Sequence, residues 1–231
     1  MRTYSGQVAE IRLDRGGEPA AWVECSRQAI PAPGRYLLAA DAEAVLAAPL
    51  FAAEVSHGGF LGAPPAPARW TPGTRLKLIG PLGRGFRRPA DARRLAVAAL
   101  GDTVARVLPL IAQALGDGLE VALFSDAPLP SLPLALEAQP LDALPESASW
   151  VDFLALDLSH ARLAELRAVL GLPAARRWPS PAQALIWTAM PCGGIGDCAV
   201  CAVPGSAGSR GTSWLLACRD GPVFDLEDLD F

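Results

Sequence analysis

The sequence predicts an α/β plus all-β fold in three consecutive parts: an antiparallel β-barrel, a small parallel α/β layer and a short cysteine-rich segment. Three observations support this order. Short alternating segments fill the N-terminal third of the chain, strand and helix patterns alternate in the middle, and four of the five cysteines lie within residues 192–218. We therefore expect three domains, at residues 1–88, 89–184 and 185–231.

The first part consists of short runs in which polar and apolar residues alternate. The runs are QVAEIRL, AAWVECS, GRYLLAA, FAAEV and TRLKLIG, and glycine and proline turns separate them. A period of two places successive side chains on opposite faces of a strand. Many short strands with turns between them predict a small antiparallel barrel.

The second part alternates between strand and helix patterns. Its buried-strand candidates are RRLAVAAL, LEVALFSD and WVDFLALDL. Residues 102–115 predict a helix interrupted near Pro109, and residues 159–171 predict an amphipathic helix that Ser159 caps and Gly171 ends. Two proline-rich stretches, GAPPAPARW and DAPLPSLPLALEAQPLDALPESAS, predict loops.

Length and composition exclude several classes of protein. With 231 residues, 51% of them hydrophobic, the chain can bury a core without disulfide cross-links. The longest apolar run, residues 44–53, is too short to cross a membrane, and the N-terminus lacks the apolar stretch of a secretory signal. The net charge of −4 and the scattered arginines favour neither a nucleic-acid nor a membrane partner. We expect a cytoplasmic protein, and the surroundings of His57 and His160 suggest no catalytic residue.

The cysteines carry the strongest chemical signal. Cys192, Cys198, Cys201 and Cys218 have the spacing C-x5-C-x2-C-x16-C, whereas Cys25 lies far away in an expected barrel strand. A structural zinc site usually takes two ligands from each of two C-x2-C turns. Three cysteines on one loop and one distant cysteine are typical of a 2Fe-2S cluster of the plant-ferredoxin kind, and the intervening glycines would let backbone N–H groups approach its sulfurs. A zinc site and unrelated buried thiols are the alternatives.

The segment CGGIGDCAVC, with WLLACRDGPVFDLEDL after it, resembles the electron-transfer subunit of the two-subunit, NAD-linked dihydroorotate dehydrogenases. PGRYLLA and GTRLKLIGPLGRGF are similar to the family's PGQF-like strand and its GPLG-x-GF stretch. The resemblance implies a ferredoxin-reductase-like fold with an FAD-type barrel, a nucleotide domain and a C-terminal 2Fe-2S domain. It also implies that the four clustered cysteines are the ligands. The family has four residues between the first two cysteines where this chain has five, and we expect a bulge to absorb the extra glycine.

Two departures from the family concern its other cofactors. APLFA, residues 48–52, stands where an Arg-Pro-x-Ser motif would supply an arginine to the FAD pyrophosphate and a hydroxyl near the flavin. AALGD, residues 98–102, replaces a glycine-rich phosphate turn and brings a carboxylate to it. We therefore expect NAD binding to be lost. FAD binding is left open, with no binding residue assigned and with Arg35 or Arg84 as substitute phosphate partners.

The sequence therefore predicts an iron–sulfur electron-transfer subunit, an oxidoreductase component rather than a stand-alone enzyme. By resemblance, its partner in a hetero-oligomer is the flavin-containing catalytic subunit of a dihydroorotate dehydrogenase of pyrimidine biosynthesis, or a related flavoprotein. Its electrons would pass to an external acceptor. Two alternatives stay open: an intact FAD and 2Fe-2S reductase that uses NAD(P)H, and a structural subunit stabilised by zinc.

Overall fold

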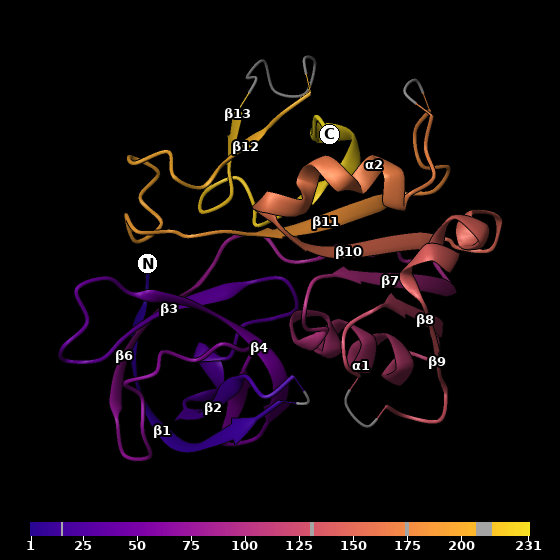
Figure 1. Cartoon of the computed structure of the whole chain (residues 1–231). Coiled ribbons are helices and arrows are strands. Elements are labelled where there is room, and N and C mark those ends of the chain that lie inside the picture. Colours follow the sequence, from indigo (N-terminus) through magenta and orange to yellow (C-terminus); the bar gives the residue numbers. More distant parts are fainter. Residues whose placement is uncertain (15, 130–131, 174–175, 207–213) are drawn as a thin grey trace.

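A closed barrel and a six-stranded sheet form the body of the protein. The computed structural model describes residues 1–14, 16–129, 132–173, 176–206 and 214–231. The barrel and the sheet lie side by side, and the cysteine-rich segment lies above the barrel in the view of Figure 1. The predicted fold class is therefore confirmed. No helix among the described residues has both the length and the apolar character needed to cross a membrane.

Six antiparallel strands close the barrel. They are β1 (Thr3–Leu13), β2 (Pro19–Cys25), β3 (Tyr36–Ala40), β4 (Ala48–Ser56), β5 (Gly59–Gly62) and β6 (Arg75–Leu82), in the spatial order β1-β2-β5-β4-β3-β6. Alternation decides which side chains face inward: Leu76 and Leu78 of β6 are buried, whereas Lys77 between them is exposed. Strand β5 was not predicted. Strand β5 pairs with β2 so closely that only glycine fits at position 59, because a Cβ on Gly59 would lie 2.1 Å from the carbonyl oxygen of Val23.

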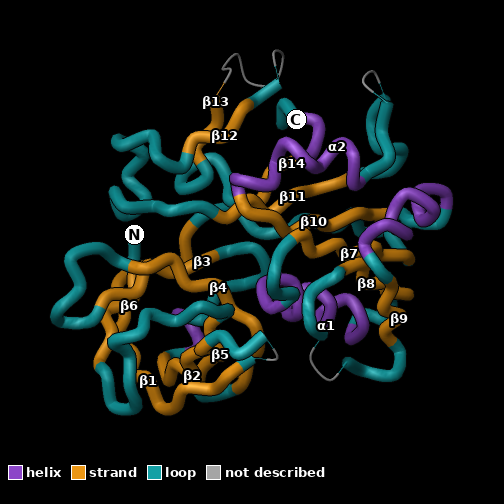
Figure 2. The backbone as a smooth tube through the Cα atoms, in the orientation of Figure 1, coloured by secondary structure: helices purple, strands orange, loops and turns teal. Residues whose placement is uncertain are grey.

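The sheet has the order β14-β11-β10-β7-β8-β9. Its strands are β7 (Arg94–Leu100), β8 (Glu120–Ser125), β9 (Leu136–Gln139), β10 (Phe153–Ser159), β11 (Ala182–Trp187) and β14 (Val223–Asp225), and only the pairing of β14 with β11 is antiparallel. The central strands β7 and β10 are buried almost throughout because the sheet is covered on both faces. Strand β14 comes from the cysteine-rich segment, so this segment is continuous with the sheet (Figure 2).

The helical regions differ from their predictions in detail. A short 3-10 helix, η2 (Ala105–Val107), precedes α1 (Leu108–Gly116), so Pro109 stands in the first turn of a helix instead of interrupting one. Residues 159–171 form a 3-10 helix, η4 (His160–Glu165), and only one α-helical turn, α2 (Leu166–Val169). Ser159 makes no capping hydrogen bond, but Gly171 ends the segment with a φ of 61°, as predicted. The second proline-rich stretch is not all loop, because it supplies β9 and a 3-10 helix, η3 (Leu141–Ser149).

The C-terminal segment packs into the same core. The hairpin of β12 (Ala202–Pro204) and β13 (Trp214–Leu216) is followed by β14 and by a 3-10 helix, η5 (Leu226–Asp228). Leu226 and Leu229 are buried, and the Arg167 guanidinium lies over the ring of Phe231 at 5.1 Å. One hydrophobic cluster includes residues of the barrel, the sheet and this segment, which fixes the cysteines relative to both.

Candidate metal centre

The hairpin brings two of the predicted ligands together. Cys201 directly precedes β12 and Cys218 follows β13, and Ala202 pairs with Leu216 across the hairpin. The backbone N–H of Cys218 donates to the sulfur of Cys201 at 3.5 Å. Both side chains are buried, with exposed fractions of 1% and 4%. The distant fourth cysteine therefore reaches the cysteine loop because strand pairing carries it there.

The loop after β11 places the other two cysteines around the same point. The Cys192 thiol accepts hydrogen bonds from the backbone N–H groups of Gly196, Asp197 and Cys198 and lies within hydrogen-bonding reach of the Cys198 thiol. These contacts, led by the Gly196 N–H, lower the pKa of Cys192 to about 6. Gly196 has a φ of 90°, a conformation that favours glycine and turns its N–H inward. This stretch therefore stabilises a thiolate with several N–H groups, as a cluster-binding loop requires.

Cys218 connects the two halves of the set. Burial raises the pKa of its thiol to about 12, and hydrogen bonding with the Cys201 thiol and the charges of Cys201 and Cys192 add to the shift. The thiols of Cys192, Cys201 and Cys218 would repel one another as thiolates, and a cationic metal centre would relieve that repulsion. In the described ranges no group of three or more Cys, His, Asp or Glu side chains is arranged so that it could hold a metal ion. The donor set and the loop N–H groups fit an iron–sulfur cluster.

A barrel side chain supports this loop. Tyr36, the first residue of β3, is fully buried, and its hydroxyl donates to the carbonyl oxygen of Cys218 at 3.2 Å. Burial raises the pKa of Tyr36 above its ordinary range, so the hydroxyl keeps its proton and remains a donor. The sequence analysis did not identify this residue as part of the site. Only its place in PGRYLLA could have drawn attention to it, because 182 residues separate the two partners.

The residues where the barrel contacts the sheet determine whether a flavin could bind there. Phe51 of β4, where the family motif would have its hydroxyl, is buried with its ring centroid 5.8 Å from that of Tyr36. These two rings belong to the same core cluster as Leu100 and Ala105 of the α/β layer. Arg35 is not a free phosphate partner, because it donates to the carbonyl oxygens of Gly83 and Pro81 at 3.1 and 2.7 Å. Phe51 and Arg35 therefore supply neither the hydroxyl nor the phosphate partner that a flavin of the family would need.

The turn after β7 is where the family would bind the phosphates of a nicotinamide dinucleotide. Its only glycine, Gly101, is followed by the exposed Asp102, and α1 begins six residues after Asp102, at Leu108. Arg106 is buried there, with its Nε atom 3.0 and 3.1 Å from the carboxylate oxygens of Asp157 at the end of β10. The guanidinium also lies 4.7 Å from the ring centroid of Trp187. An internal ion pair covered by an indole occupies this edge of the sheet, and these residues do not fit a dinucleotide phosphate.

The remaining residues from the sequence analysis lie elsewhere. Cys25 is half-buried in β2, where burial raises the pKa of its thiol to about 11, and it has no part in the cysteine cluster. His57 lies at the β4–β5 turn and lines a largely apolar hollow of about 830 Å³ between β4 and α1. His160 begins η4 directly after β10. In the part of the chain that the structure describes, neither histidine is hydrogen-bonded to a cysteine, serine or aspartate.

Comparison with known families identifies the cysteine segment. Residues 188–230 match the iron-sulfur cluster binding domain of dihydroorotate dehydrogenase B. This stretch contains all four predicted ligands and the hairpin that brings them together. No curated protein matches the sequence significantly.

Solved structures confirm the scaffold. The NADH-dependent reduced ferredoxin-NADP oxidoreductase, described in a study of flavin-based electron bifurcation, superposes with a TM-score of 0.73 at 19% identity and covers 97% of this chain and 89% of its own. The ferredoxin reductase in carbazole 1,9a-dioxygenase has a TM-score of 0.56 at 18% identity, covering 75% and 67%. A ferredoxin-NADP+ reductase from Plasmodium falciparum has a TM-score of 0.56 at 6% identity, covering 80% and 96%. The chain thus carries a cluster-binding domain of the dihydroorotate dehydrogenase B type on a ferredoxin-reductase-like fold, and the family resemblance of the sequence is confirmed.

Proposed function

We propose that the protein is an iron–sulfur electron-transfer subunit with one 2Fe-2S cluster held by Cys192, Cys198, Cys201 and Cys218. One observation carries the proposal: the Cys218 thiol interacts with those of Cys201 and Cys192, the Cys192 thiol is within reach of Cys198, and backbone N–H groups are directed at two of these sulfurs, all in the segment matched by the cluster-binding family. A bound cluster supplies one-electron transfer. The chain contributes the ligands, the N–H donors and an apolar surrounding that limits access of water.

The proposed ligands differ in exposure, and this difference indicates the side of the loop on which electrons are exchanged. Cys201 and Cys218 are buried against the hairpin and the barrel, whereas Cys198 is exposed. Exposed apolar side chains, Ile195 at 69% and Val200 at 52%, flank Cys198 on both sides. Exposed large apolar residues at a functional site indicate contact with another protein. We infer that the redox partner docks on this side of the loop, so that the outward ligand lies nearest to it.

The proposed partner is the flavin-containing catalytic subunit of a dihydroorotate dehydrogenase, in a hetero-oligomer of pyrimidine biosynthesis, or a related flavoprotein. The family of the cluster domain supports this assignment. The division into a barrel, an α/β domain and a cluster domain at residues 1–88, 89–184 and 185–231 is part of the same proposal, as is a cytoplasmic location. Since the residues at the flavin and dinucleotide positions do not fit those groups, the external acceptor receives its electrons from the cluster.

Anaerobic purification followed by spectroscopy and analysis of iron, sulfide, zinc and flavin tests the ligand assignment. The intact protein should contain the iron and sulfide of one 2Fe-2S cluster per chain, without stoichiometric flavin. Cys201→Ser should lose the normal cluster spectrum, whereas Cys25→Ser, the matched control, should keep it. A colourless protein with stoichiometric zinc would identify a structural site instead. A normal spectrum in Cys201→Ser would contradict the ligand assignment.

The wild-type subunit and the Cys25→Ser variant also test the partner. When the wild-type subunit is mixed with a dihydroorotate dehydrogenase catalytic subunit, dihydroorotate should bleach the cluster absorbance through the partner's flavin. Cys25→Ser should behave like the wild type. A loaded cluster that dihydroorotate does not reduce in the mixture would exclude this partner while leaving the cluster assignment intact.

A further inference from the structure

The turn that follows β13 carries a cationic side chain next to the proposed ligands. Across residues 188–206 and 214–220, Arg219 is the only lysine or arginine, and the acidic residues are Asp197 and Asp220. Arg219 directly follows Cys218, and its side chain is 63% exposed. A charge this close to a metal centre acts on the electrons of that centre, so the position of the guanidinium group matters.

Backbone hydrogen bonds hold this turn in place. The N–H groups of Arg219 and Asp220 both donate to the carbonyl oxygen of Leu216, at 3.0 and 2.7 Å. The N–H of Ala217 donates to the carbonyl oxygen of Cys201 at 3.0 Å. The N–H of Leu216 donates in turn to the carboxylate of Asp220 at 2.9 Å. Arg219 therefore projects from a backbone that the hairpin fixes, and the carboxylate beside it is held as well.

The ion pair of Arg219 and Asp220 is oriented with its positive group toward the cysteine loop. The Nε and Nη2 atoms of Arg219 each lie 3.3 Å from a carboxylate oxygen of Asp220. The Nη1 and Cδ atoms form the other edge of the side chain, and they lie 3.9 and 3.7 Å from the place of a Cβ on Gly196. No atom of Asp220 comes as close to that place. The guanidinium charge is thus nearer to the loop than the carboxylate that pairs with it.

Gly196 connects this charge to a second proposed ligand. Its backbone N–H leads the hydrogen bonds to the Cys192 thiol. The guanidinium group therefore lies against the turn whose N–H groups point at the Cys192 sulfur. Because Arg219 is also bonded through the chain to Cys218, one fixed positive charge lies beside both ligands.

We propose that Arg219 raises the reduction potential of the cluster as a fixed positive charge beside the cysteine loop. This role rests on the function proposed above, since it concerns the same 2Fe-2S cluster. Reduction adds one negative charge to the cluster, and a nearby guanidinium group stabilises that charge by Coulomb attraction. The guanidinium group does not titrate near neutral pH, so its contribution to the potential is constant there. Loss of Arg219 makes the cluster harder to reduce.

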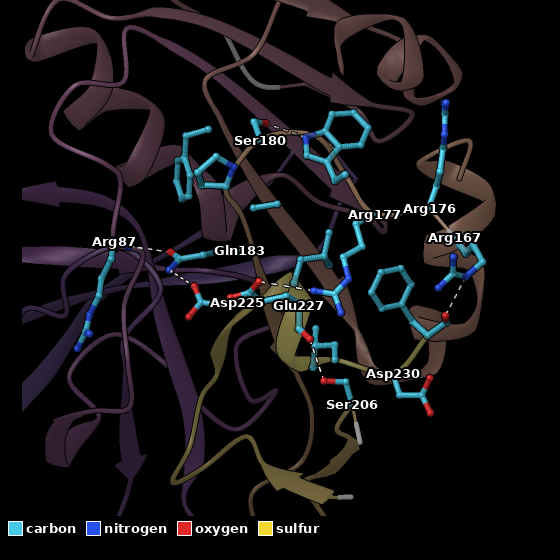
Figure 3. Close-up of a pocket in the computed structure, with 17 residues that line it drawn as sticks. Arg87, Arg167, Arg176, Arg177, Ser180, Gln183, Ser206, Asp225, Glu227 and Asp230 are labelled. Atoms are coloured by element: carbon cyan, nitrogen blue, oxygen red, sulfur yellow. Dashed lines mark hydrogen bonds and ion pairs between the residues drawn. The ribbon is translucent and has the colours of Figure 1, made fainter. Parts of the chain in front are cut away.

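An arginine of the hollow in Figure 3 resembles Arg219 in exposure and pairing but lies away from the cysteines. Arg177 is exposed and pairs with Glu227 at 3.8 Å, in a hollow of about 560 Å³ at the start of β11. The cysteine loop follows the other end of β11, a strand of six residues and therefore about 17 Å long. That separation exceeds the Debye length of about 8 Å at physiological ionic strength. Arg177 is therefore the matched control.

A reductive titration of the cluster-loaded full chain, with redox mediators and visible absorbance as the signal, measures the potential. Arg219→Gln should lower the ratio of reduced to oxidised cluster at a fixed potential about 3- to 10-fold, which is about 30 to 60 mV for a one-electron couple. Arg219→Lys should recover at least half of this shift, since it keeps the charge. The shift should shrink at about 1 M salt, where the Debye length is about 3 Å. Arg177→Gln should change the ratio less than about 1.5-fold.

The outcomes separate this role from the cluster assignment. A potential that does not change in Arg219→Gln, in a protein with the wild-type cluster spectrum, would overturn the proposal and leave the proposed function intact. The same result with slower reduction by the flavoprotein partner would assign Arg219 to docking instead. Equal shifts in Arg219→Gln and Arg219→Lys would also overturn the proposal, because the loss would not follow the charge. So would loss of the cluster in Arg219→Gln, since the residue would then hold the loop. A wild-type protein that contains no cluster would refute the proposed function itself.

Discussion

Removing one hydroxyl tests how the barrel supports the metal centre. Tyr36→Phe deletes the donor to the Cys218 carbonyl oxygen, a buried bond of 3.2 Å, and leaves the ring and its contact with Phe51 in place. No other donor to that oxygen is found in the described ranges. The carbonyl therefore stays buried and unsatisfied, and the expected loss is about 1–3 kcal/mol in the free energy of unfolding.

Urea denaturation of the cluster-loaded protein under anaerobic conditions measures this loss, with tryptophan fluorescence as the signal. Transfer of iron to a chelator gives a second measurement, and it should be about 5-fold faster or more in Tyr36→Phe because the Cys218 backbone is less restrained. Tyr4→Phe is the matched control. Tyr4 is the other tyrosine of the chain, and its hydroxyl makes no hydrogen bond within the described ranges.

Tyr4→Phe should stay within about 0.5 kcal/mol of the wild type. If Tyr36→Phe matched Tyr4→Phe in both stability and chelator resistance, the hydroxyl would have no role in holding the cysteine loop. Faster iron loss without a change in stability would also refute the reasoning, because the magnitude follows from an unsatisfied buried carbonyl.

Two further predictions concern ion pairs of the α/β layer. Arg106→Met leaves Asp157 as an unpaired buried carboxylate and should cost about 3–5 kcal/mol, whereas the double variant with Asp157→Leu should recover most of that loss. Since burial already raises the pKa of Asp157, the deficit of Arg106→Met should shrink as pH falls and the carboxyl takes up a proton; a deficit independent of pH would argue against this cause. Asp152 behaves oppositely, because hydrogen bonds from the Arg94 side chain and from the N–H groups of Arg93 and Arg94 lower its pKa to about 2. Its contribution to stability is present above its ordinary pKa of 3.8 and is lost as pH falls toward about 2, so Asp152→Asn should flatten acid unfolding over that window.

The barrel and the parallel strands could be predicted because their patterns are strong. Alternation in β1 and β6 and the continuous apolar runs of β7 and β10 report burial directly. Strands β5 and β9 could not be predicted in the same way. Each has four residues, β5 contains two glycines, and β9 lies in a proline-rich stretch, so each depends on pairing with a neighbouring strand.

The helices show where local rules fail. Residues 159–171 have the apolar spacing of an amphipathic helix, yet residues 160–165 form a 3-10 helix and only residues 166–169 are α-helical. Leu163 and Leu166 are both buried against the sheet, and a tighter turn satisfies that packing as well as an α-helical turn does. The sequence predicts an interruption at Pro109 because it does not show at which residue the helix begins. Pro109 lies in the first turn of α1, where its missing N–H removes no helical hydrogen bond.

The cluster-binding segment could be identified because its signal lies in short spacings of one residue type, and the assignment of its four cysteines as ligands stays a prediction. The supporting contacts could not. Tyr36 meets Cys218 across 182 residues, and Arg106 meets Asp157 across 51. Neither pair has a local pattern, since one forms only when β3 packs against the cysteine segment and the other only when η2 packs against β10.

These long-range contacts explain how a reductase-like fold can concentrate its chemistry in one segment. A cofactor between two domains contributes to their contact, so its replacement requires side chains that fill the space and satisfy the polar groups. The Phe51 and Tyr36 rings fill the barrel side, and the pair of Arg106 and Asp157 satisfies the edge of the sheet. Tyr36 also takes part in the support of Cys218. The same packing that closes the interdomain contact therefore positions the cysteine loop, and the loop leaves Cys198 exposed on the side where the proposed redox partner would dock.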